Sequence, residues 1–296
     1  MLFIGDYIIS QRKKKGMTQK ELVENICSEV TLSRIENNQQ TPNYNTVTKL
    51  LMKLGLPPSL FPAYMNEKEL ELLTLRHEIN QHLIHERHDE AEVLLNKMIR
   101  KAKGETVFEQ YVAYIQAIML MKSNAEEALN ALIKAAKMSI NDLAPKNILR
   151  QAMTQDELGM LKNIAICYER TNKYDEAIEI YYAILEYIEE KVIAHKDISA
   201  LYTAVTYLLS CLVGQKGDMK EVIRLCDDGI KRCLEFGTYY SLAGLLYNKG
   251  YALVETEGPC AACKYIQEAY YIYRARGNRL NCEHTLKYAI KNGIPV

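Results

Sequence analysis

The sequence predicts an all-α protein in which a compact bundle of short N-terminal helices precedes an array of helix pairs. Three observations favour this fold. Apolar residues recur three and four positions apart along nearly the whole chain, which is the period of an amphipathic helix. Three prolines within six residues, at 57–62, interrupt that pattern. Beyond them, a helix-pair pattern repeats at intervals of about 37 to 49 residues.

The composition separates the two parts and excludes several classes of protein. The 296-residue chain has 37 basic and 37 acidic side chains, so bulk charge gives it no general affinity for nucleic acid. Residues 1–65 hold eight basic and five acidic groups, which indicates that the N-terminal part alone contacts nucleic acid. Seven prolines, 14 glycines and a hydrophobic content of 48% exclude collagen-like and disordered chains.

The first two helices of the bundle are predicted from their apolar residues and caps. An apolar stripe that starts at Ile4 predicts the first helix, and Gly16 suits the position just beyond its C-terminal end. Thr18 and Glu21 form a capping box at the start of the second helix, because the hydroxyl and the carboxylate can each accept a backbone N–H.

Two further helices follow after short turns. Ser28 can cap a third helix whose apolar residues are Leu32 and Ile35, and Pro42 opens a fourth helix that closes at Gly55. Helices of about ten residues that are joined by two or three residues cannot lie parallel, so the second and third cross steeply. The sequence therefore predicts a helix-turn-helix, whose second helix fits the major groove of DNA.

The bundle also resembles a known DNA-binding domain. The residues that carry the resemblance are Arg12-x3-Gly16-x-Thr18-Gln19-x2-Leu22, Ile26-Cys27-Ser28, Leu32-Ser33-Arg34-Ile35-Glu36-Asn37 and Pro42. They resemble the Cro/Xre-type helix-turn-helix, and most of all the domain of the Rgg/PlcR/PrgX peptide-sensing regulators.

This resemblance implies roles for individual side chains. Arg12 and Glu36 match an internal ion pair that ties the first helix to the third. The residues at DNA-facing positions are Gln19, Ser28, Glu29, Thr31 and Arg34, with Gln19 on a phosphate, although each could also be an ordinary solvated side chain. Glu29 departs from the family's Gln: a carboxylate repels phosphate, but it can accept a hydrogen bond from cytosine N4.

The prolines at 57–62 place a boundary between a domain at 1–65 and a domain at 66–296. In the second domain the clearest helix pair runs from Leu161 to Leu185, and its spacing of small and large residues resembles the tetratricopeptide repeat. The small residue that marks each second helix predicts five units, centred on Ala91, Ala128, Ala177, Val222 and Ala262. The resemblance implies a right-handed α-solenoid of about five such pairs, with a capping helix near 279–291.

Stacked helix pairs place their first helices on a concave face that suits ligand binding. Asn163 and Asn248 occupy the same position in two repeats, where an Asn resembles the tetratricopeptide residue that brackets a peptide backbone with its amide donor and acceptor. A bond to backbone or water is the alternative interpretation of either Asn. The predicted peptide-binding residues are Arg76, Asn80, Tyr114, Lys162, Asn163, Ile166, Tyr207, Tyr247, Asn248 and Tyr251.

Sequence patterns of catalysis and metal binding are missing. The chain has no phosphate-binding loop, dinucleotide fingerprint or nucleophile elbow, so we expect neither an enzyme nor a cofactor. Cys260-x2-Cys263 has no second pair at zinc-ribbon spacing and is interpreted as two small packing residues. Four histidines cluster without a nearby Cys that could complete a zinc site, namely His77, His82, His85 and His88.

Over its whole length, the chain resembles the Rgg/PlcR/PrgX class. The resemblance implies a homodimeric transcription regulator that binds double-stranded operator DNA and senses a short quorum-sensing peptide. We expect a cytoplasmic protein, because the basic run at 12–15 follows the apolar residues rather than preceding them as in a secretory signal. Two alternatives stay open: a helix-turn-helix regulator whose repeats bind a partner protein, and a Rap-like response-regulator inhibitor, against which Gln19, Ser28 and Arg34 argue.

Overall fold

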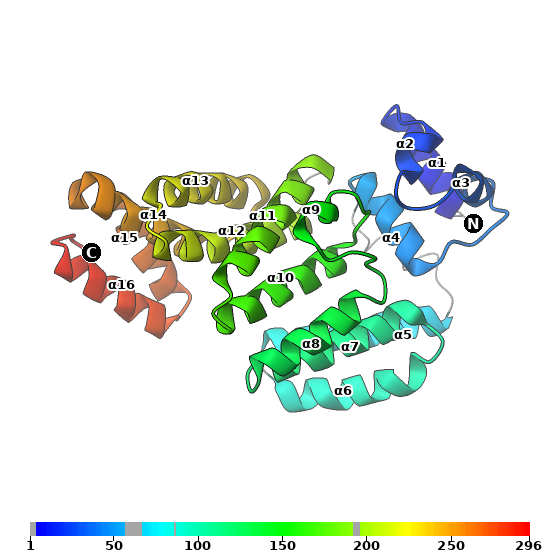
Figure 1. Ribbon diagram of the computed structural model, residues 1–296, viewed down its shortest axis with the longest axis horizontal. Helices are drawn as coiled ribbons and strands as arrows, with labels where there is room; N and C mark the ends of the chain where they lie inside the picture. The colour runs from blue at the N-terminus through cyan, green and yellow to red at the C-terminus, as the bar shows by residue number, and fades with distance from the viewer. Residues whose placement is uncertain (1–3, 57–66, 86, 192–195) are drawn as a thin grey trace. The chain divides into compact units, whose positions relative to one another are not determined.

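The computed structural model describes residues 4–56, 67–85, 87–191 and 196–296, and within these ranges it contains sixteen α-helices and no strand (Figure 1). The predicted all-α class is therefore confirmed. The helices form two compact units, the first with α1 to α10 and the second beginning at α11. The predicted domain boundary near 57–66 lies outside the described residues.

The first four helices form a bundle, here called the head, around a fully buried apolar core. Ile8, Leu22, Leu32, Ile35 and Leu50 meet in this core. The helices are α1 (Ile4–Lys14), α2 (Gln19–Val23), α3 (Glu29–Glu36) and α4 (Tyr44–Lys53).

Glycine and asparagine permit the tight geometry of the head. A Cβ atom at Gly5 would lie 2.0 Å from the carbonyl oxygen of Ile35, so only glycine lets α1 approach the backbone of α3 this closely. Gly16 follows α1 with φ +69°, as expected for the residue after a helix. Asn38 takes φ 57° after α3, in a left-handed conformation that Asn tolerates better than most residues.

In the rest of the first unit, each helix packs against a helix that is close to it in the chain. In this unit α5 packs on α6, α7 on α8, and α10 on α8. A short extra helix that starts with a proline lies between α8 and α10, and it explains the longest predicted repeat spacing. These helices are α5 (Glu67–Ile84), α6 (His88–Lys101), α7 (Thr106–Leu120), α8 (Ala125–Ala136), α9 (Pro145–Ile148) and α10 (Gln155–Arg170).

The second unit continues the same pattern with longer helices. There α12 packs on α13, α14 on both α13 and α15, and α16 on α15. The last helix has the bounds that the sequence predicts for a capping helix. The helices are α11 (Tyr174–Lys191), α12 (Lys196–Gln215), α13 (Met219–Phe236), α14 (Leu242–Glu257), α15 (Pro259–Ala275) and α16 (Arg279–Lys291).

The small residues that predict the repeats are all buried near the start of a second helix. They lie on α6, α8, α11, α13 and α15, as the sequence predicts: Ala91, Ala128, Ala177, Val222 and Ala262. A small side chain there lets paired helices approach closely. The division into units falls between α10 and α11, the two helices of the clearest predicted pair.

Among the described helices, α12 alone has a stretch long and apolar enough to cross a membrane, at Ile198–Gln215. Its mean hydropathy is 1.4, and 56% of the stretch is buried within the protein. Since α12 packs against α13 and α14, this burial is that of a core helix.

Candidate functional site

Two side-chain caps start the helices that form the predicted DNA-binding surface. The Thr18 hydroxyl accepts from the Glu21 backbone N–H at 3.2 Å, and the Glu21 carboxylate accepts from the Thr18 N–H at 2.6 Å, so the predicted capping box at α2 is confirmed. Ser28 caps α3, because its Oγ accepts from the backbone N–H of Thr31 at 3.1 Å. These caps fix where both helices begin.

A buried ion pair holds α3, the predicted recognition helix, against α1. Arg12 donates from Nε to Glu36 Oε1 at 2.6 Å and from Nη2 to Oε2 at 2.8 Å, as the resemblance implies. The hydrogen bond to Glu36 raises the pKa of the Arg12 guanidinium above its usual value. Gln19 Nε2 also donates to Glu36 Oε2, at 2.7 Å, so the carboxylate orients this amide at the start of α2.

The remaining predicted DNA-binding residues lie at the N-cap of α3 and on the helix itself, as far as its last turn. Glu29 and Arg34 are exposed, and no ion pair with another described residue occupies either side chain. The hydroxyls of Ser28 and Thr31 lie 2.9 Å apart and take part in the cap. Val30 on the first turn of α3 is apolar yet 61% exposed, and sequence reasoning did not single it out because it lies outside the apolar stripe of the helix.

In the first unit, two of the predicted peptide-binding residues belong to one polar network. Arg76 Nη2 donates to Asp156 Oδ1 at 2.5 Å, and the guanidinium lies 4.8 Å from the centre of the Tyr111 ring. The Tyr111 hydroxyl donates to Asn80 Oδ1 at 2.8 Å. The neighbouring Asp156 charge raises the pKa of Arg76, although burial opposes it. Asp156 and Tyr111 were missed because no repeat position marks them.

A second group in the same unit joins α7 to α10. Asn163 Nδ2 donates to the Tyr114 hydroxyl at 2.7 Å, and burial raises the pKa of that hydroxyl. Lys162 precedes Asn163 on α10, and burial lowers the pKa of its ammonium group. The lysine forms no ion pair with another described residue, and the half-buried Ile166 follows one turn later.

In the second unit, the predicted residues lie on α12 and α14. Asn248 Nδ2 donates to Ser210 Oγ at 2.8 Å and lies 3.2 Å from Cys211 Sγ. The ring of Tyr207 contacts the backbone of α14 at Gly244, where a Cβ would lie 2.4 Å from the ring.

Two further predicted tyrosines pack against the capping helix. The rings of Tyr247 and Tyr251 lie 5.6 and 5.5 Å from that of Tyr288, and Tyr247 is also 5.4 Å from His284. Burial raises the pKa of Tyr247 to about 12. These two side chains therefore contribute to the packing of α14 on α16 as well as to the predicted surface.

The two asparagines at equivalent repeat positions use their amides in the same way. Each donates its Nδ2 to a hydroxyl on the first helix of the preceding pair, Tyr114 for Asn163 and Ser210 for Asn248. Within the described ranges, neither Oδ1 accepts a hydrogen bond from the protein. Each amide is thus anchored by its donor while its acceptor is free for a ligand N–H.

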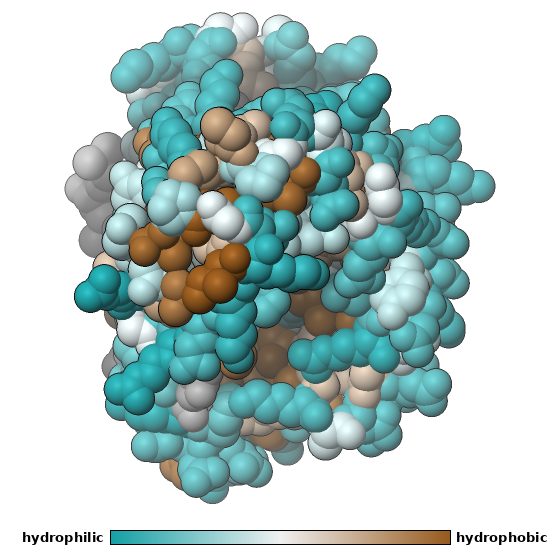
Figure 2. Space-filling view, turned by 90° about the vertical axis from the view of Figure 1, so that its left-hand side faces the viewer, coloured by the Kyte–Doolittle hydropathy of each residue, from teal (hydrophilic) through white to brown (hydrophobic). Residues whose placement is uncertain are grey.

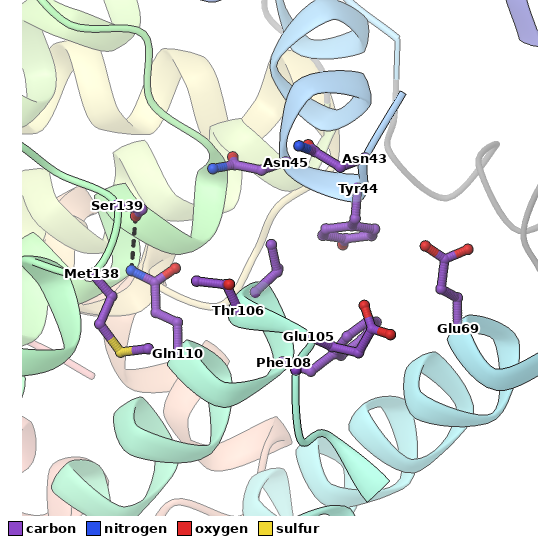
Figure 3. A pocket seen from close by; sticks show the side chains of 12 residues that line it. Asn43, Tyr44, Asn45, Glu69, Glu105, Thr106, Phe108, Gln110, Met138 and Ser139 are labelled. Atoms are coloured by element: carbon purple, nitrogen blue, oxygen red, sulfur yellow. Dashed lines mark hydrogen bonds between the residues drawn. The ribbon is translucent and has the colours of Figure 1, made fainter. Parts of the chain in front are cut away.

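The head meets the repeats of the first unit at a pocket of about 410 Å³, shown in Figure 3. The Tyr44 ring at the start of α4 lies 5.8 Å from the Phe108 ring on α7. At the other side of the pocket, on the left in Figure 3, Gln110 Nε2 donates to Ser139 Oγ at 2.8 Å. Arg76 reaches the same junction, because its Nη1 donates to the Tyr44 hydroxyl at 3.4 Å. A predicted peptide-binding residue thus also contacts the head.

The cysteines and histidines form no candidate metal site among the described residues, where no cluster of three or more His, Cys, Asp or Glu side chains occurs. Cys260 and Cys263 lie on the first turns of α15, one exposed and the other half-buried, and both are free thiols.

Comparisons with known proteins now define the class and the family. A helix-turn-helix family model matches residues 8–61, so the head is a DNA-binding module. A model described as the RNPP family C-terminal domain matches residues 100–288, which is more than half of the chain. The chain belongs to the RNPP family of peptide-controlled transcription regulators, which is not an enzyme family. No curated protein sequence matches the chain.

Solved structures share the fold at low sequence identity. PlcR of Bacillus thuringiensis, in complex with the peptide PapR7 and DNA, is 18% identical with a TM-score of 0.62 and covers 95% of this chain and 98% of its own. The apo form of the competence regulator ComR from Streptococcus vestibularis is 13% identical with a TM-score of 0.56, over 99% of this chain and 98% of that one. Both likenesses support the fold and no more.

Proposed function

We propose that this chain is a homodimeric cytoplasmic regulator with a DNA-binding domain at 1–65 and a peptide-binding and dimerisation domain at 66–296. Family membership supports peptide control of DNA binding. PlcR, the similar structure with the higher TM-score, holds both a peptide and DNA. The assignment of residues below rests on the geometry of this chain.

The head binds operator DNA through the start of α2 and the exposed side of α3. Gln19 and Arg34 contact phosphates, since charged and amide donors there form the commonest protein–DNA bonds. Ser28 and Thr31 order the first turn of α3 and offer hydroxyls to the DNA. Glu29 accepts from cytosine N4, and the exposed Val30 side chain contacts a thymine methyl group.

The repeats bind a short peptide in an extended form. One observation carries this assignment: Asn163 and Asn248 are anchored alike through Nδ2 and present a free Oδ1. Such an oxygen recognises backbone N–H groups whatever the peptide's sequence. Selectivity among peptides rests on the other predicted residues, which are Arg76, Asn80, Tyr114, Lys162 and Ile166 in the first unit and Tyr207, Tyr247 and Tyr251 in the second.

The exposed apolar surface of the last helices supports the homodimer. Figure 2 looks at the end of the molecule that carries α15 and α16, and hydrophobic side chains gather there on a largely hydrophilic face. On α16, Leu280 is 79% and Ile290 69% exposed, and Tyr271 on α15 is exposed as well. A capping helix needs a polar outer face in a monomer, so these side chains favour contact with a second copy.

The test combines native mass with peptide capture. The purified chain is incubated with conditioned medium of its source organism, and retained peptides are identified by mass spectrometry. Wild type is compared with Asn163→Ala/Asn248→Ala and with Asn130→Ala, an exposed amide on the second helix α8, as the control. Selection from random duplex DNA then follows, with and without the captured peptide.

We expect a dimer that retains a short peptide and selects a palindromic site, and a double variant that loses the peptide but keeps the DNA site. The Asn130→Ala control should behave like wild type. A wild-type protein that retains no peptide and selects no DNA contradicts the proposal. Retention of a protein in place of a peptide favours the partner-protein alternative.

A further inference from the structure

A pocket in the second unit lies beside the predicted peptide-binding residues and shares only Tyr207 with them. Its volume is about 310 Å³, and it opens between α12, the start of α14 and the turn from α15 to α16. This size is at the lower end of ligand pockets and suits a single amino-acid residue rather than a large cofactor.

The pocket has one charged residue, and it is a cation. Arg276 donates from Nη1 to the carbonyl oxygen of Tyr240 at 2.9 Å and more weakly to that of Tyr239 at 3.4 Å. Its guanidinium lies 4.9 Å from the centre of the Tyr240 ring. No acidic side chain lines the pocket, and no described carboxylate pairs with Arg276. The remaining N–H groups of a fixed guanidinium are therefore free for an anion.

The start of α14 adds to this positive potential. Ser241 is the N-cap of this 16-residue helix, and its side chain makes no capping hydrogen bond. Ser241 is only 7% exposed, yet it lines the pocket. A buried hydroxyl without a cap bond, at the positive end of a helix dipole, is suited to donate to a carboxylate.

Three tyrosines form the walls beside this polar end. Tyr207 is held in place because its ring already fills the space where a Cβ of Gly244 would lie. Tyr240 is 82% exposed at the rim, and Tyr273 lies close enough to Arg276 that the guanidinium opposes the raised pKa of its hydroxyl. The pocket thus offers an anion site next to aromatic surface, and α14 leads from it within one turn to Asn248.

We infer that this pocket binds the C-terminal residue of the peptide, with its terminal carboxylate on Arg276 and Ser241 and its last side chain among the three tyrosines. The inference rests on the proposed peptide-binding function. An extended chain whose backbone N–H bonds to Asn248 can end in this pocket, since the pocket residue Gly244 and Asn248 lie one turn apart on α14. The regulator is then selective for peptides whose chain ends in this pocket, and a peptide with further C-terminal residues does not fit.

The test uses two degenerate peptide mixtures of equal length, one with free C-terminal carboxyl groups and one C-terminally amidated. Each is passed over the immobilised full chain, and retained peptides are quantified by mass spectrometry. Wild type should retain the acid mixture about tenfold more than the amide, the effect of about 1.4 kcal/mol from one charge-assisted contact. Arg276→Gln should abolish the preference, and Arg276→Lys should keep part of it.

The matched control is Arg274→Gln, which removes an exposed arginine on the last turn of α15 that does not line the pocket. It should preserve the wild-type preference. Equal retention of acid and amide by wild type, or an unchanged preference in Arg276→Gln, overturns the inference while leaving peptide binding intact. A wild-type protein that retains neither mixture overturns the proposed peptide binding as well.

Discussion

Removal of the Arg12 guanidinium should destabilise the head severely. Arg12→Met leaves the Glu36 carboxylate, whose side chain is 1% exposed, without its two bonds from arginine. Breaking a buried ion pair by removing one partner costs about 3–5 kcal/mol. At roughly 0.05–0.15 kcal/mol per residue, a bundle of about 55 residues has about 3–8 kcal/mol to lose. The variant should therefore populate an unfolded head, and its DNA affinity should fall with it.

Hydrogen exchange followed by mass spectrometry measures this effect locally. Peptides from α1 and α3 should lose most of their protection in Arg12→Met, while peptides from α13 in the second unit serve as an internal reference. Arg12→Met/Glu36→Met removes both charges and should recover most of the loss, because an apolar pair of similar volume replaces a buried ion pair at little cost. A loss below about 1 kcal/mol, the level of a surface pair, refutes the reasoning. So does a double variant as unstable as the single one.

Three further outcomes are expected. Lys162→Met removes an ammonium group whose pKa burial lowers, so the melting temperature by circular dichroism should rise by about 2–4 °C while peptide retention weakens. Hydrogen bonds from Thr18 lower the pKa of Glu21 below its usual value of 4.5. The cap of α2 is therefore fully stabilising above pH 4.5 and weakens as the pH falls through the folded-state pKa, and the protection factor of α2 against hydrogen exchange should fall with it. Gly244→Ala crowds the Tyr207 ring and should lower protection in α14 by about 1–3 kcal/mol. An unchanged melting temperature of Lys162→Met contradicts the first expectation. A protection factor of α2 that does not vary with pH contradicts the second, and wild-type protection of α14 in Gly244→Ala contradicts the third.

Local chemistry made the helix boundaries predictable. Thr18 with Glu21, and Ser28 by itself, cap helices where the sequence places them, because a cap depends on residues only three positions apart. The buried markers of the second helices were predictable for a related reason: a small residue at helical spacing encodes close approach of two helices. Both patterns involve residues within one or two helical turns of each other, so they can be recognised in the sequence.

Long-range partners could not be predicted in this way. Asp156 pairs with Arg76, which is 80 positions away in the sequence. Ser210 Oγ accepts a hydrogen bond from the amide of Asn248, which is 38 positions away. No periodicity links such residues, since either could have faced water on its own helix. The pocket at Arg276 was missed for a similar reason, because it combines α12, α14 and a turn that share no motif.

Arg76 connects the head to the repeats within the first unit. One guanidinium nitrogen bonds Asp156 on α10 of the repeats, and the other bonds the Tyr44 hydroxyl on α4 of the head. On the proposed function, a peptide that competes for either partner changes the contact with the head. Linkage then requires reciprocity: if peptide weakens DNA binding by some factor, DNA weakens peptide binding by the same factor. Tyr44→Phe removes only the hydroxyl, so it should reduce this coupling while leaving both separate affinities close to their wild-type values.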